Sequence, residues 1–178
     1  MAGANPEHAL ATANLSTALN AALRPHGCRV YSPDLRVKVE ASGLQTYPDV
    51  TVLCGAPKYT EDKPPALTNP TLIAEVLSES TEAYDRGTKF HHYCRIQSLT
   101  THLLVSQSGP TVELLVRKAE FQWEHQVVSG LDSLVEIPTL GSSSHCETSL
   151  RESTFCPLLC DLPKPEPAGQ CSSLTLSS

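Results

Sequence analysis

The sequence predicts an α/β protein in which helices flank a β-sheet that continues into an antiparallel extension. One observation is a run of leucines at helical spacing within residues 7–23. A second is a pair of short apolar segments with strand composition, at residues 50–53 and 70–78. A third is a series of three segments with alternating apolar and polar residues between residues 101 and 128. Helical and strand periodicities that alternate along one chain are typical of a sheet covered by helices.

The first predicted helix covers residues 7–23, and the segment Pro25-His26-Gly27 ends it. Alternating apolar and basic residues then predict strands at residues 29–31 and 34–39, before a turn at residues 41–43. Residues 57–70 are rich in Pro, Lys, Asp and Thr and are predicted to form a surface loop.

The second predicted helix covers residues 82–95, after the strand at 70–78. Ser80 or Thr81 can cap this helix, and Gly87 interrupts it. The three alternating segments that follow are joined by short turns, which favours antiparallel pairing between them.

Length and composition predict one domain with a substantial core. The chain has 178 residues, of which 40% are hydrophobic and 18% charged, as in ordinary globular proteins. After Gly141 the sequence becomes rich in Ser, Pro and Cys and loses its periodicity. We therefore expect a domain at residues 1–141 and a disordered tail at residues 142–178.

The chain contains no apolar run of the roughly 20 residues that a membrane span needs. Its N-terminus also lacks the pattern of a secretory signal, so we expect a cytoplasmic protein. Three widely spaced cysteines, Cys28, Cys54 and Cys94, are accordingly expected to be reduced thiols that fill packing positions. The formal net charge of −6 argues mildly against extensive non-specific binding to nucleic acid.

Two acids occupy unusual positions beside the apolar strands. Asp49 follows a proline and stands directly before residues 50–53, and Glu75 lies in the middle of residues 70–78. If these strands are neighbours, both carboxylates meet at one edge of the sheet, where they could hold a hard cation such as Mg²⁺ together with water. Lys89, on the following helix, could direct its ammonium at the same place.

Other interpretations of these acids stay open from spacing alone. Asp49 could be a turn residue, and Glu75 could face solvent. Asp34 repeats the same Pro-Asp-apolar pattern in "SPDLRV". His91 and His92 with Cys94 are expected to be surface or half-buried residues, because adjacent side chains on a helix point in different directions.

Four stretches together resemble a known family. They are "PDVTVLCG", "NPTLIAEVLSESTEAYDRGTKFHHY", "LTTHLLVSQ" and "VELLVRK", and the similarity runs from about His8 to Leu140. This pattern resembles the Uma family of restriction-endonuclease-like proteins, a branch of the PD-(D/E)XK nuclease superfamily. The resemblance implies a restriction-endonuclease-like fold with a central mixed sheet. It also implies a site in which Asp49 and Glu75 bind Mg²⁺ or Mn²⁺ and a lysine completes the catalytic group.

The sequence departs from the superfamily pattern at three places. The usual lysine lies two residues after the second acid, where this chain has Leu77, so the role would pass to Lys89. Relatives carry a further segment before the first helix, so we expect the domain to be N-terminally truncated. The Ser/Cys/Pro-rich stretch after Leu140 also differs from the apolar stretch expected there.

The sequence therefore gives two hypotheses for function. The first is a Mg²⁺-dependent endonuclease that hydrolyses phosphodiester bonds in DNA, with Asp49, Glu75 and Lys89 as catalytic residues. The alternative is an inactive nuclease-fold remnant that binds DNA or a protein partner. A continuous basic strip would favour this alternative, and its candidate members are Arg36, Lys38, Arg86, Lys89 and Arg95. Whether the chain forms a homodimer is left open.

Overall fold

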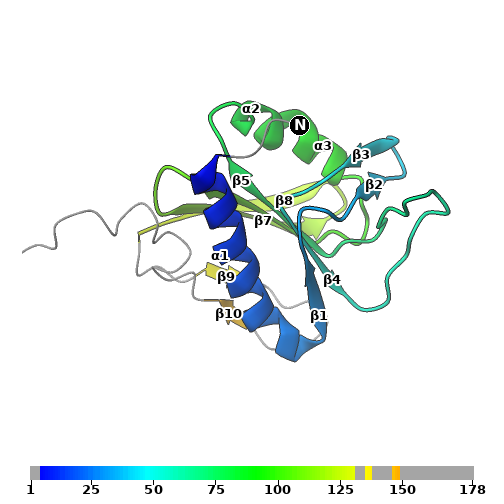
Figure 1. Cartoon of the computed structure of the whole chain (residues 1–178), viewed down its shortest axis with the longest axis horizontal. Helices are drawn as coiled ribbons and strands as arrows, with labels where there is room; N and C mark the ends of the chain where they lie inside the picture. The colour runs from blue at the N-terminus through cyan, green and yellow to red at the C-terminus, as the bar shows by residue number, and fades with distance from the viewer. Residues whose placement is uncertain (1–4, 131–134, 138–145, 149–178) are drawn as a thin grey trace, which may run out of the picture.

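A six-stranded mixed β-sheet forms the centre of the protein (Figure 1). The computed structural model describes residues 5–130, 135–137 and 146–148. Within the sheet the strand order is β1-β4-β5-β6-β7-β8, and only β5 and β6 run parallel among these neighbours. The predicted α/β fold with a central mixed sheet is confirmed. The six strands are β1 (Cys28–Tyr31), β4 (Val50–Cys54), β5 (Leu72–Leu77), β6 (Thr101–Ser106), β7 (Thr111–Ala119) and β8 (Gln122–Ser129).

Helix α1 (Pro6–Leu23) covers one face of this sheet. Its leucines at positions 15, 19 and 23 are almost wholly buried against apolar side chains of β4, β5 and β6. Asn5 caps the helix by accepting a hydrogen bond from the amide of His8 at 2.8 Å, and Pro6 occupies the first turn, where no amide donor is needed. The predicted helix at residues 7–23 is thus observed one residue longer.

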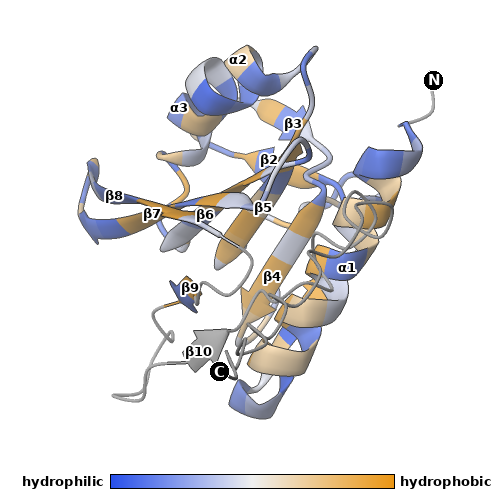
Figure 2. Ribbon diagram, turned by 90° about the vertical axis from the view of Figure 1, so that its left-hand side faces the viewer, coloured by the Kyte–Doolittle hydropathy of each residue, from blue (hydrophilic) through white to orange (hydrophobic). Residues whose placement is uncertain are grey.

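The opposite face carries a broken helix and a small hairpin, as Figure 2 shows above the sheet. The broken helix consists of α2 (Glu82–Tyr84), a π-helical turn η2 (Asp85–Lys89) and α3 (Phe90–Tyr93). The π turn spans five residues with Gly87 at its centre, and Gly87 is the residue expected to interrupt the predicted helix at 82–95. A π turn widens the backbone locally and shifts the side chains that follow it.

The hairpin is formed by β2 (Val37–Val39) and β3 (Leu44–Thr46), which pair in a separate two-stranded sheet. The predicted strand at 34–39 was therefore too long, because Ser32 to Leu35 close a turn through the hydrogen bond from Leu35 N to Ser32 O at 3.2 Å. Gly43, with φ of 74°, provides the left-handed backbone that the turn between β2 and β3 needs.

The expectation of reduced thiols at Cys28 and Cys54 was wrong. These residues form a disulfide between β1 and β4. Antiparallel pairing places them directly opposite each other, with their Cα atoms 4.1 Å apart, although 26 residues separate them in sequence. Cys94 is a free, half-buried thiol. Sequence spacing could not reveal the pair because the register of two strands is set by tertiary packing.

Two short strands complete the described chain. Strand β9 (Val135–Ile137) pairs with β10 (Cys146–Thr148). A 3₁₀ turn, η1 (Arg24–His26), follows α1. Strand β10 lies beyond the predicted domain boundary at residue 141, while residues 149–178 of the predicted tail lie outside the described residues. No helix in the described part of the chain is long and apolar enough to cross a membrane.

The packing of α1 predicts a large loss of stability in Leu19→Ala. Leu19 is fully buried, so its truncation leaves a cavity between the helix and the sheet and should lower the free energy of unfolding by about 2–5 kcal/mol. Leu10→Ala on the same helix is the matched control, since Leu10 is 44% exposed and its loss should cost much less. Urea unfolding followed by circular dichroism measures both, and equal losses would contradict the packing described for α1.

Candidate functional site

The antiparallel register of β4 and β5 brings Asp49 beside Glu75. Val50 of β4 is paired with Ala74 of β5. Asp49, the residue before β4, therefore stands opposite Glu75. The amide of Val76 donates to Asp49 Oδ2 at 2.8 Å, and the amide of Asp49 lies 3.4 Å from Glu75 Oε2. Asp49 is therefore neither a free turn residue nor a repeat of the Asp34 pattern, because its carboxylate bonds to the backbone of the neighbouring strand.

Glu75 is a buried carboxyl group, 2% exposed, on the sheet face that α3 covers. Its Oε1 accepts a hydrogen bond from Tyr93 OH at 2.8 Å and lies 2.9 Å from Lys89 Nζ. Burial raises the pKa of Glu75 to about 7; the positive charge of Lys89 opposes this rise and the negative charge of Asp49 adds to it. The carboxyl group of Glu75 therefore changes charge near neutral pH.

Lys89 points into the same site from the π turn. It is 8% exposed, and its ammonium lies 2.9 Å from both Glu75 Oε1 and Asp85 Oδ1. Burial lowers the pKa of Lys89, but attraction to Glu75 and Asp85 outweighs burial, so the net shift is upward. The structure thus brings the three predicted site residues together, and Lys89 is held as a cation.

His8 reaches the site from α1, on the other side of the sheet edge. Its Nε2 lies 3.2 Å from Asp49 Oδ2, and the hydrogen bond to Asp49 raises the pKa of His8 despite partial burial. Both carboxylates therefore have fixed partners: His8 and the Val76 amide hold Asp49, while Lys89 and Tyr93 hold Glu75.

Of these residues, His8, Asp49, Glu75 and Lys89 line an open cleft of about 590 Å³. Its titratable groups are the carboxyl groups of Asp49, Glu75 and Asp85, the ammonium of Lys89 and the ring of His8. Uncharged residues complete the wall: Asn5, Thr46, Tyr47, Ser78, Ser80, Thr81 and Tyr84. Carboxylates therefore dominate the charge of the cleft.

The donor set fits a hard, hydrated cation better than a transition metal. Asp49 and Glu75 supply two carboxylates beside an open cleft, and Mg²⁺ is commonly bound by one or two carboxylates while it keeps several waters. The negative charge of Asp49 also contributes to the raised pKa of Glu75, and a cation would relieve this repulsion. Among the described residues, no group of three or more His, Cys, Asp or Glu side chains could hold a metal by itself.

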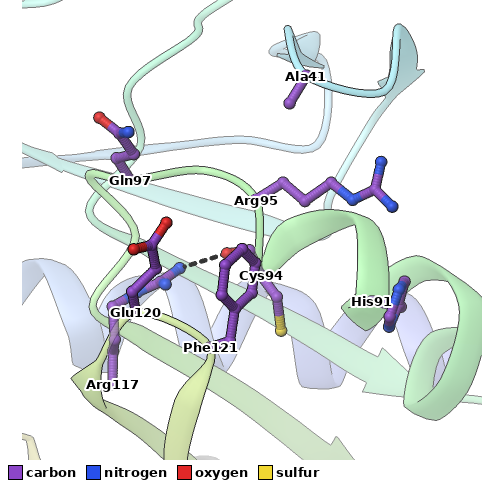
Figure 3. Close-up of a pocket in the computed structure, with 8 residues that line it drawn as sticks. All are labelled: Ala41, His91, Cys94, Arg95, Gln97, Arg117, Glu120 and Phe121. Atoms are coloured by element: carbon purple, nitrogen blue, oxygen red, sulfur yellow. Dashed lines mark hydrogen bonds between the residues drawn. The ribbon is translucent and has the colours of Figure 1, made fainter.

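A second cavity, of about 520 Å³, lies beyond the end of α3 (Figure 3). His91 is exposed there, and His92 and Cys94 are half-buried, as the sequence led us to expect. Arg117 on β7 donates hydrogen bonds to the carbonyl groups of Cys94, Ile96 and Leu99. Arg117 therefore anchors the segment that follows α3, at the end of the broken helix that contains Lys89 and Tyr93.

The five residues of the hypothetical basic strip do not form a free positive surface. Lys38 pairs with Asp62, and Arg86 pairs with Glu82 and Glu113. Lys89 is buried with its two carboxylate partners. Arg36 donates to a backbone carbonyl group. Arg95 is exposed, and its backbone amide donates to the carbonyl group of His92.

Comparisons with known proteins show the family and the fold of this chain. Residues 1–148 match the family model Uma2, described as "Putative restriction endonuclease". The chain belongs to the Uma2 family. A solved Uma2-like fold is that of a protein from Anabaena variabilis described as a putative nuclease belonging to DUF820. It aligns with a TM-score of 0.63 and 18% identity, over 88% of this chain and 84% of the other.

Two similar proteins come from Synechocystis sp. The uncharacterized protein sll1609 is 35% identical over 136 residues, which cover 76% of this Uma2 chain and 77% of the relative. The uncharacterized protein slr1290 is 32% identical over 155 residues, covering 87% and 80% respectively. Their names describe no activity, so the Uma2 relatives support the family and the fold rather than a reaction.

Sequence reasoning missed two residues that touch the carboxylates. Tyr93 lies four residues after Lys89, so a strict reading of one helix face could have placed both near Glu75. His8 offered no such signal, because its contact with Asp49 depends on how α1 lies across the sheet.

The raised pKa of Glu75 predicts a specific loss of stability with pH. The pKa of Glu75 is about 7 in the folded chain, whereas the ordinary pKa of a glutamate is about 4.5, so the folded chain holds this proton more tightly than the unfolded chain. The free energy of unfolding should therefore fall as pH rises from about 4.5 to about 7. Urea unfolding at several pH values should show this fall in the wild type and a smaller one in Glu75→Gln. Glu61→Gln, in an exposed loop position, should behave like the wild type; an unchanged profile in Glu75→Gln would contradict the assignment.

Proposed function

We propose that this protein is a Mg²⁺-dependent endonuclease that hydrolyses phosphodiester bonds in DNA, with Mn²⁺ as an alternative ion. One observation carries the proposal: Asp49 and Glu75 meet on adjacent strands at an open cleft that Lys89 also enters. Membership of the Uma2 family supports the reaction class.

Asp49 and Glu75 are the residues that would hold the metal. A bound Mg²⁺ would supply charge neutralisation at the scissile phosphate and lower the pKa of a water molecule. The backbone amide of Val76 and the ring of His8 fix Asp49, while Tyr93 fixes one oxygen of Glu75. Such fixed partners keep the carboxylates aligned without rearrangement, which is the condition for electrostatic catalysis.

Lys89 has the charge and position to act on the reacting phosphate. Its ammonium is already held at the cleft by Glu75 and Asp85, so little conformational freedom remains to be lost when substrate binds. In this role the ammonium orients the attacking water and offsets the negative charge that develops on the phosphate oxygens. Asp85 would then act as the positioning residue for Lys89.

The charge of the cleft explains why a cation would be required. Three carboxylates face one lysine ammonium, so a phosphate would meet net repulsion in the absence of a metal. The net charge of −6 on the whole chain acts in the same direction. A divalent cation would offset this negative charge at the place where the phosphate must enter.

The alternative function is binding of DNA or a protein partner without cleavage. Its specific support is the ion pair of Lys89 with Glu75 Oε1, because this ammonium already neutralises the carboxylate that a metal would use. Lys38 and Arg86 already form ion pairs with acidic side chains, which weighs against the continuous basic strip that would accompany such DNA binding.

Cleavage assays on site variants test the proposal. Asp49→Asn and Glu75→Gln should each reduce the rate of cutting of supercoiled and linear DNA by about 100-fold or more, since each removes a charge that holds the metal. Lys89→Met should reduce the rate at saturating Mg²⁺ while metal binding is retained. Ca²⁺ should support binding but little cutting, because it tolerates looser coordination geometry than Mg²⁺.

Asp34→Asn is the matched control, since Asp34 follows a proline as Asp49 does but is exposed and away from the cleft. It should cut at the wild-type rate. Cleavage that survives Glu75→Gln would show that this cleft is not the catalytic centre. If the wild-type chain cuts neither probe with any divalent metal ion, the binding function is favoured.

A further inference from the structure

Two exposed tyrosines stand in the wall of the cleft that contains Asp49 and Glu75. Tyr47 is 55% exposed and Tyr84 is 46% exposed, and both line the cleft. They come from separate elements: Tyr47 follows β3, and Tyr84 is the last residue of α2. Aromatic rings that are open to solvent in the wall of a polar cleft offer flat faces on which a planar group can stack.

Each tyrosine is tied closely to a site residue. Tyr47 lies two residues before Asp49, and the intervening Pro48 is buried and restricts Tyr47 to an extended backbone. Tyr84 lies directly before Asp85 and five residues before Lys89, at the entrance to the π turn. The rings are therefore carried by the same backbone segments that position the carboxylates and the ammonium.

The remainder of the cleft wall is poorly suited to grip a double helix. Duplex binding depends on several Lys or Arg contacts to phosphates. Among the described residues, those that line the cleft include no arginine and a single lysine, the buried Lys89. Hydroxyl groups of Ser78, Ser80 and Thr81 supply neutral donors instead. In a duplex the faces of the bases are also covered by stacking, so protruding rings would find no base to contact.

Unpaired strands offer what this wall can bind. Their bases are free to stack on aromatic rings, and such stacking provides affinity with little dependence on sequence. We infer that the cleft takes single-stranded or locally unpaired DNA, with Tyr47 and Tyr84 as stacking platforms for bases on either side of the phosphate that faces Asp49 and Glu75. This inference rests on the proposed function for the identity of the substrate.

Binding measurements with matched probes test the inference. A fluorescein-labelled oligothymidylate and a blunt hairpin duplex of similar length are titrated with the full chain in Ca²⁺, and anisotropy gives the dissociation constants. The wild type should bind the single strand at least about tenfold more tightly than the duplex, because its bases are free to stack. Tighter binding of the duplex would overturn the inference.

Variants separate stacking from other roles of the tyrosines. Tyr47→Ala and Tyr84→Ala should each weaken binding of the single strand about tenfold or more, and Tyr47→Phe and Tyr84→Phe should restore it because the ring is kept. Tyr59→Ala is the matched control, since Tyr59 is 45% exposed but does not line the cleft. Equal binding by Tyr47→Ala, Tyr84→Ala and the wild type would overturn the inference.

Cleavage of the same probes in Mg²⁺ distinguishes this inference from the proposed function. If the single strand binds tightly, depends on the tyrosines for binding and is not cut, the inference is retained and the proposed nuclease function is rejected. Efficient cutting of the duplex that depends on Glu75 but not on either tyrosine would retain the nuclease and overturn the inference.

Discussion

The buried carboxyl group of Glu75 is the constraint on which the site depends. A charge in the middle of a six-stranded sheet is costly, and burial accordingly raises the pKa of Glu75 to about 7. The structure offsets this cost with Lys89 and Tyr93, both from the broken helix on the same face. A carboxyl group poised between its two charge states is well suited to accept a cation, because the cation favours the ionised form.

The broken helix is what delivers these partners. Its π turn ends at Lys89, and α3 follows directly and ends at Tyr93. The local widening of the backbone in the π turn therefore affects the direction of both side chains. Arg117 fixes the far end by donating to three carbonyl groups that follow α3, and its guanidinium lies 4.4 Å from the centre of the Trp123 ring. The geometry around Glu75 is therefore supported from β7 and β8 as well as from the helix.

Local patterns in the sequence were enough for most of the helical and strand segments. Spacing alone left open whether Asp49 and Glu75 meet, since Asp34 repeats the same pattern; the family resemblance implied it, and the register of β4 and β5 brings them together. Contacts that depend on tertiary register were not accessible in this way. The disulfide between Cys28 and Cys54 and the contact of His8 with Asp49 both join segments whose relative placement only the folded sheet determines.

Diffraction from crystals soaked in Mn²⁺, at an energy that gives an anomalous signal, tests the central claim most directly. The account predicts a single strong anomalous peak in the cleft, coordinated by a carboxylate oxygen from Asp49 and one from Glu75, with Lys89 still facing the cleft. The peak should be absent in Glu75→Gln and present in Asp34→Asn. A map without a peak between the two carboxylates, in which Lys89 keeps its ion pair with Glu75, would contradict the claim that this pair holds a catalytic metal.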